Sequence, residues 1–168
     1  MSDRTANLLG VLGLSVAERL REATQGVSGH QGETPAALVV IGYGMGPSNE
    51  RLRSALGLSH PGSVRLVDRL VADGLVERRR GEDRRSVALY LTQRGEEMRA
   101  QILAERLQAI GPFLSGLNAD EAEMFADLIA KMLKAMDIPD AERCRLCRLC
   151  DDTVCVDCPI PADFRTRA

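Results

Sequence analysis

The sequence predicts a mainly α-helical protein with one small β-hairpin, an α+β fold in which long helices flank a compact unit. Apolar residues recur at spacings of three and four over most of the chain, as in helices that bury one face. Residues 75–79 and 87–91 instead suit two strands, with Gly81 and polar residues in the turn between them. Aromatic residues make up only 3% of the chain and Trp is absent, so we expect a core of Leu, Val, Ile, Ala and Met.

The first helix is predicted over residues 6–24, where Leu8, Leu12, Val16 and Leu20 recur every four positions. A loop rich in glycine and polar residues follows over residues 26–33. Thr34 can cap a second helix over residues 35–43, whose apolar run indicates burial on most sides.

Two short helices with a tight turn come next. Ser48 can cap the first, in which Leu52, Ala55 and Leu56 share one face, and Gly57 stops it because glycine adopts the left-handed conformation at little cost. Ser59 can cap the second helix, and Gly74 ends it. The expected buried stripe of that second helix is Val64, Val67, Leu70 and Val71.

Two longer helices close the folded part. One runs from Thr92 until Gly111-Pro112, and the other begins at Asn118, where Glu121 three residues later completes a capping-box pattern. The last helix is expected to end at Ile138-Pro139 and to bury Met124, Leu128, Met132 and Leu133.

Positive charge gathers on the helix pair and the hairpin. Residues 48–92 hold nine Arg against six Asp and Glu, although the whole chain has a net charge of −2, and five of these arginines lie between positions 78 and 85. A helix pair beside a basic hairpin is typical of proteins that read a DNA duplex through its grooves. The alternative interpretation is a solvated hairpin tip of mixed charge.

The same stretch resembles the winged helix-turn-helix of the MarR family of bacterial transcriptional regulators. The resemblance covers about residues 5–138, and its sharpest motifs lie in residues 48–95. The matching residues are Gly57-Leu58-Ser59, Val67-Asp68-Arg69-Leu70, Asp73-Gly74-Leu75-Val76-Glu77-Arg78, Asp83-Arg84-Arg85 and Leu89-Tyr90-Leu91-Thr92.

The resemblance implies a role for each matching position. Arg85 corresponds to the arginine that enters the minor groove from the wing tip, and Asp83 to the acid that braces it. Arg65 is the expected guanine reader, because one guanidinium can bond O6 and N7 together. The face of the recognition helix would comprise Ser59, His60, Ser63 and Arg65, with Ser48 and Asn49 also facing DNA, and Arg69, Arg79 and Arg84 would contact phosphates.

The family further implies a homodimer, in which the first and last helices of two subunits interleave and the two wings straddle a pseudo-palindromic site. Intramolecular packing is the alternative for Leu8, Leu12, Ile129 and Leu133. Family members are usually repressors, and often bind small aromatic anions between the dimer helices and the DNA-binding lobe. We therefore expect double-stranded DNA, a second copy of the chain and a small-molecule effector as partners.

All five cysteines lie in residues 144–158. Cys147-x2-Cys150 and Cys155-x2-Cys158 form a paired motif whose four thiolates suit tetrahedral zinc, with Cys144 as a spare or a substitute for Cys147. A thiol redox switch or metal sensor, an iron–sulfur cluster and a tail without a site remain open as alternatives. The family resemblance ends near residue 138 and does not decide among them.

The predicted organisation has four parts. These are an N-terminal dimerisation helix and loop (1–33), a winged helix-turn-helix (34–95), C-terminal dimerisation helices (96–138) and a cysteine-rich tail (139–168). His30 and His60 lie in no catalytic constellation, so we expect no enzyme. Neither a membrane span nor a signal peptide is predicted, and the cytoplasm is the expected location. The alternative function is a protein–protein adaptor that docks a partner through the winged domain and a zinc knuckle.

Overall fold

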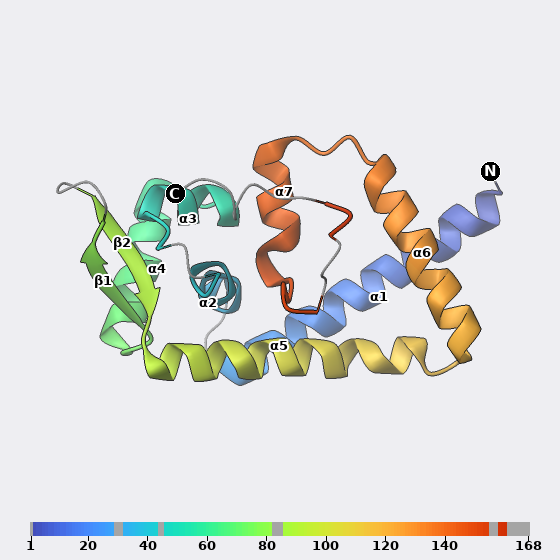
Figure 1. Cartoon of the computed structure of the whole chain (residues 1–168), viewed down its shortest axis with the longest axis horizontal. Helices are drawn as coiled ribbons and strands as arrows, with labels where there is room; N and C mark the ends of the chain where they lie inside the picture. Colours follow the sequence, from blue (N-terminus) through green and yellow to red (C-terminus); the bar gives the residue numbers. More distant parts are fainter. Residues whose placement is uncertain (1, 29–31, 44–45, 82–85, 155–157, 161–168) are drawn as a thin grey trace.

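The computed structural model describes residues 2–28, 32–43, 46–81, 86–154 and 158–160. It confirms a mainly helical fold with one antiparallel hairpin (Figure 1). No helix in these ranges is both long and apolar enough to cross a membrane. In chain order the elements are α1 (Asp3–Ser28), α2 (Thr34–Ile41), α3 (Asn49–Leu56), α4 (His60–Ala72), β1 (Val76–Arg80), β2 (Val87–Leu91), α5 (Gln93–Leu114), α6 (Ala119–Ala135), α7 (Asp140–Leu146) and the 3-10 turn η1 (Cys147–Leu149).

The core is built around α2, and all eight of its residues are buried. Helices α3, α5 and the turn η1 pack around it, and the hairpin lies beside α4. The two longest helices, α1 and α5, pack against each other and extend away from this lobe, while α6 lies at the far end from the hairpin (Figure 1). The core therefore lies in the lobe that holds the hairpin, α3 and α4. The helices at the other end of the molecule, α6 and the start of α1, bury little of their surface.

Local signals place most helix ends correctly. The side chain of Ser48 accepts a hydrogen bond from the Arg51 amide, and the Asn118–Glu121 capping box is present in both directions. Gly57 adopts φ +66°, and Gly74 adopts φ +67° just after α4. These positions confirm the expected start and end of α3, the end of α4 and the start of α6.

Several helix boundaries differ from expectation. Helix α1 runs over Asp3–Ser28 instead of 6–24, α2 ends at Ile41 instead of residue 43, and α6 ends at Ala135 instead of at Ile138-Pro139. Thr34 is the first residue of α2 rather than its cap, and its buried hydroxyl accepts a bond from Arg69 instead. Helix α5 passes through Pro112 to Leu114. Proline has no N–H to donate to the carbonyl four residues earlier, and α5 ends two residues after it. The Ser115 hydroxyl donates to the Pro112 carbonyl at 2.9 Å, which supplies a partner for one carbonyl at this helix end.

The predicted burial of α6 is wrong for the single chain, because none of its residues is buried. Met124 is 64% exposed, Leu128 52% and Met132 45%, while Leu8, Leu9, Val11 and Leu14 on α1 are also exposed. Apolar side chains on both α1 and α6 therefore remain in contact with water in the single chain.

Candidate DNA-binding interface

The candidate DNA-reading unit consists of α3, the turn at residues 57–59 and α4. Each helix begins at a serine cap: Ser59 accepts a bond from the Gly62 amide, as Ser48 does from Arg51. Leu52, Ala55 and Leu56 bury one face of α3 against its neighbours. The caps and the left-handed turn at Gly57 fix where each helix starts and how the two are joined.

The buried face of α4 is rotated from the one expected. Ser63, Leu66, Val67 and Leu70 are buried, whereas Val64 is only half-buried. The hydroxyl of Ser63 has no exposed surface and is satisfied internally, donating to the His60 carbonyl at 3.0 Å and accepting from Asn49 at 3.1 Å. Because a hydrogen-bonded serine costs little to bury, it can replace an apolar residue at this position.

This rotation corrects the expected orientation of Ser63, which faces the core and not the surface. Asn49 is half-buried, and its side chain braces α3 against α4 through the bond to Ser63. Both residues are thus structural supports of the reading unit.

The exposed face of α4 carries Ser59, His60, Arg65 and Arg69. Within the described part of the chain, no hydrogen bond or ion pair engages Arg65. Arg69 instead reaches the Thr34 hydroxyl at 3.4 Å, which ties α4 to the start of α2. Arg65 is therefore the guanidinium on this face that is available to a ligand.

The hairpin is fixed to α4 by contacts that the sequence did not predict. Arg78 on β1 forms an ion pair with Asp68 on the exposed side of α4. Arg79 bonds Glu77 and lies over the ring of Tyr90 on β2, 4.6 Å from the ring centroid. Arginine stacks readily on aromatic faces, so the strand arginines are held in defined positions.

The tip of the hairpin, residues 82–85, lies outside the described residues and includes Asp83, Arg84 and Arg85. The strands are described up to either side of it. Arg80 pairs with Val87, and the Gly81 amide donates to the Ser86 carbonyl at 2.9 Å. The wing-tip roles of these three residues stay predictions from the sequence.

The hairpin is also anchored to α5. The hydroxyl of Thr92 donates to the Gly74 carbonyl at 2.7 Å, and its amide donates to the Leu75 carbonyl at 3.1 Å. Gly95 lies so close to this junction that a Cβ atom there would be 2.0 Å from the Leu75 carbonyl oxygen. The hairpin, the end of α4 and the start of α5 therefore form one tightly packed joint.

The cysteine tail packs on the lobe. Cys144, Cys147 and Leu149 pack against its core, and α7 packs against α3. Cys150 and Cys158 are half-buried, and Cys155, one of the four expected zinc ligands, lies outside the described residues. Among residues with described positions, no three His, Cys, Asp or Glu side chains form a metal site. The expected zinc set is thus only partly described, and its ligation stays a prediction.

Tyr43 and Arg99 hold the first cysteine turn, and sequence reasoning missed both. The Tyr43 hydroxyl shares its single proton between two acceptors in a bifurcated hydrogen bond, the Cys147 carbonyl at 2.7 Å and the Cys150 carbonyl at 3.1 Å. Burial, and secondarily the nearby cysteines, raises the pKa of Tyr43 far above its usual value, so the hydroxyl stays protonated as a donor. Arg99 pairs with Asp152 at 3.3 Å.

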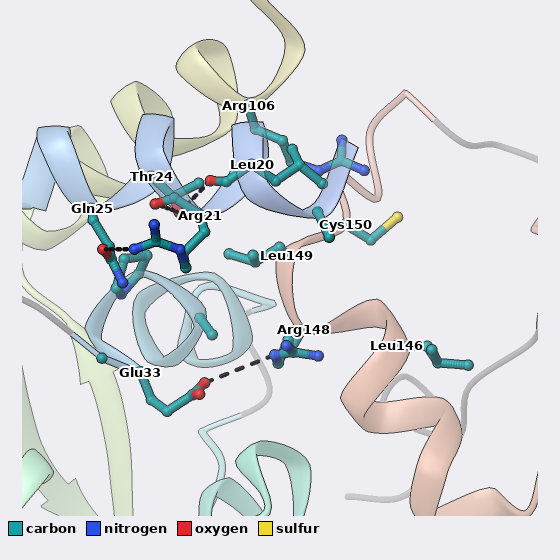
Figure 2. A pocket seen from close by; sticks show the side chains of 14 residues that line it. Leu20, Arg21, Thr24, Gln25, Glu33, Arg106, Leu146, Arg148, Leu149 and Cys150 are labelled. Atoms are coloured by element: carbon teal, nitrogen blue, oxygen red, sulfur yellow. Dashed lines mark hydrogen bonds and ion pairs between the residues drawn. The ribbon is translucent and has the colours of Figure 1, made fainter. Parts of the chain in front are cut away.

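A cavity of about 440 Å³ lies between α1, the start of α2, α5 and the tail (Figure 2). Its lining combines apolar Leu20 and Leu149 with the side chains of Arg21, Arg106 and Arg148. Arg21 is paired with Glu18, and Arg148 lies 3.8 Å from Glu33. The cavity thus offers apolar surface beside positive charge.

Comparison with known proteins identifies the same unit. Residues 36–86 match the MarR family. The YusO protein from Bacillus subtilis is 21% identical with a TM-score of 0.67, over 79% of this chain and 94% of that chain. Wild-type MarR from E. coli is 23% identical with a TM-score of 0.62, over 76% and 96%.

A MepR mutant from S. aureus, solved bound to an oligodeoxyribonucleotide, has the same fold. It is 18% identical to this chain with a TM-score of 0.59, and the match covers 78% of this chain and 96% of that one. At these identities the likeness shows a shared winged-helix fold.

Proposed function

We propose that the chain is a homodimeric, sequence-specific DNA-binding regulator of transcription in the MarR family, with no enzymatic role. The observation that carries the proposal is the basic face of α4 joined to the arginine-bearing hairpin through the Arg78–Asp68 ion pair. This arrangement lets one rigid unit approach two grooves, with α4 in the major groove and the hairpin in the minor groove.

Specificity on this proposal comes from Arg65, with Ser59 and His60 beside it at the exposed start of α4. Because the Arg65 guanidinium makes no hydrogen bond within the described residues, it can donate to both O6 and N7 of one guanine. Arg69 and Arg79 are already oriented by internal partners, which suits contacts to phosphate oxygens. The sequence assigns Arg84 to a phosphate, and Arg85, braced by Asp83, to the minor groove.

Dimerisation is supported by the unburied apolar faces of α1 and α6. Leu14 is 77% exposed and Met124 64%, although the apolar residues of both helices follow a helical repeat. Covering these faces with a second copy removes them from water and sets two reading units about a two-fold axis. The matching DNA site is then a pseudo-palindrome.

A small organic anion is the effector class that suits the cavity of Figure 2, and its binding releases DNA in a repressor. Arg106 supplies charge, and Leu20 and Leu149 supply apolar surface for the rest of such a molecule. Ligand sites commonly combine an apolar lining with a few polar groups in this way.

Zinc at Cys147, Cys150, Cys155 and Cys158 remains our proposal for the tail, with Cys144 as a substitute ligand. Its support is the spacing of the cysteines together with the Cys147–Cys150 turn, in which the Cys150 amide bonds the Cys147 carbonyl at 2.9 Å. Four thiolates would bind zinc as a cross-link of the tail. Metal analysis should find about one zinc per chain; iron and sulfide would instead indicate a cluster, and no metal would indicate a redox role.

The DNA proposal is tested with a duplex selected from a random library and measured by fluorescence anisotropy. Arg65→Ala should weaken binding by about 1–3 kcal/mol and relax preference at a guanine position. Arg19→Ala, which removes an equal charge from an exposed position on α1, is the matched control and should change affinity little. Binding that is weak and controlled by salt alone would favour the adaptor function instead.

A further inference from the structure

The tail contacts the DNA-reading unit directly, through α7 and the turn that follows it. We propose that residues 142–152 form a latch that stabilises α3 in its DNA-reading position, so that any change in the Cys147–Cys150 turn is transmitted to α3 within the same subunit. The importance of this latch for DNA binding rests on the proposed function, whereas its mechanical coupling to α3 does not.

The first anchor of the latch is Tyr43, which directly follows the end of α2. Its hydroxyl lies 2.7 Å from the Cys147 carbonyl oxygen and 3.1 Å from that of Cys150. One side chain therefore engages both ends of the cysteine turn. A change of backbone conformation between the two cysteines has to break at least one of these contacts.

The second anchor is the Arg99–Asp152 ion pair, which joins α5 to the residues after the turn. The two side chains are 16% and 27% exposed, and the charged atoms are 3.3 Å apart. The guanidinium of Arg99 also lies 6.0 Å from the centroid of the Tyr43 ring. The two anchors are therefore adjacent, and a tail that moved away would leave a largely buried arginine without this carboxylate.

The opposite side of the latch covers the reading unit. Helix α7 packs against α3, and the Arg145 guanidinium covers the Gly57 turn: its Nε lies 3.1 Å from where a Cβ on that glycine would be. Cys144 packs against the same core that holds Leu52. These contacts place tail side chains at the joint between α3 and α4.

Helix α3 is suited to respond to such a support. It has eight residues, and a helix this short is not stable without tertiary packing. Only three of its side chains are buried, so the packing of α7 against it makes up a substantial part of its tertiary contacts. Two sites that stabilise one arrangement are coupled reciprocally, so loosening the latch must loosen α3.

The test is amide hydrogen exchange on the full chain, read by mass spectrometry for Tyr43→Phe and Asp152→Asn. Tyr90→Phe is the matched control, because it removes a hydroxyl from the only other tyrosine, which lies on β2. Tyr43→Phe should accelerate exchange in residues 143–150 by about 2- to 10-fold, as for the loss of one hydrogen bond. Asp152→Asn should act in the same direction.

The decisive readout is exchange in residues 50–57. If the latch supports α3, amide exchange in α3 becomes faster together with exchange in the tail in both variants. In the Tyr90→Phe control, exchange in both segments matches that of the parent protein. Faster exchange in the tail with unchanged exchange in α3 would contradict the proposed coupling between the two. Unchanged exchange in the tail would contradict the role of Tyr43 and Asp152 as anchors. Because exchange is measured without DNA, this result stands even if no specific duplex is found; if one is found, both variants should bind it less tightly.

Discussion

Replacing Gly95 by alanine should destabilise the joint between hairpin and α5 out of proportion to the single methyl group added. The new Cβ would lie 2.0 Å from the Leu75 carbonyl oxygen, 3.1 Å from its carbon and 3.3 Å from the Leu91 Cβ. A carbon and an oxygen atom in contact are normally at least about 3.3 Å apart, so the backbone at residue 75 or at residue 95 has to move by roughly 1 Å. The atom that must yield is the buried carbonyl that accepts the Thr92 amide.

The magnitude follows from three effects. Overpacking costs about 1–3 kcal/mol, and losing the Thr92 hydrogen bond costs about 1 kcal/mol. The higher helix propensity of alanine adds about 1 kcal/mol to the free energy of unfolding. The net loss in free energy of unfolding is therefore about 2 kcal/mol, which lowers Tm by roughly 4–8 °C for a chain of this size.

Thermal unfolding followed by circular dichroism at a fixed protein concentration measures this loss. Gly26→Ala is the matched control, since no atom lies within 4 Å of its added Cβ on the exposed side of α1. That variant should be neutral or more stable by up to about 1 kcal/mol. Equal effects from the two substitutions would refute the steric argument, because helix propensity alone would then explain both.

Three further predictions concern single side chains. Ser63→Ala should cost about 1–2 kcal/mol in denaturant unfolding, since its buried hydroxyl makes two hydrogen bonds; an unchanged midpoint would contradict that burial. Asn118→Ala removes the α6 capping box and should cost about 1 kcal/mol in the same unfolding measurement; an unchanged midpoint would contradict a stabilising role for the cap. Leu128→Asp should convert a dimer to a monomer in light scattering, while Val154→Asp, at a still more exposed position on the tail, should not. If both variants remained dimers, Leu128 on α6 would be excluded from the interface.

Features set by a few consecutive residues were predictable from the sequence. The serine caps of α3 and α4, the left-handed Gly57 and the capping box at Asn118 each depend on neighbours within four positions. Their physical causes, orphan amides at helix starts and the absence of a Cβ, act locally. The hairpin and the order of elements up to α6 followed from the same kind of signal, whereas α7 and η1 in the tail were not predicted.

Features that depend on distant partners were not predictable. The burial of Ser63 depends on Asn49, fourteen positions earlier, and a polar residue in an apolar stripe gives no sign of it. Tyr43 meets Cys147 across more than a hundred positions. For α6 the apolar stripe was identified, but the expected burial was wrong because the single chain supplies no surface to cover it.

The most direct test of DNA reading is selection of bound duplexes from a random library by the intact protein, followed by sequencing. We predict enrichment of an inverted repeat whose half-sites lie about one helical turn, roughly 10 base pairs, apart. We also predict that the Arg65→Ala variant loses preference for guanine at one position in each half-site. A pool that shows no enriched repeat, with binding that depends on salt concentration alone, would contradict the assignment of α4 as a recognition helix.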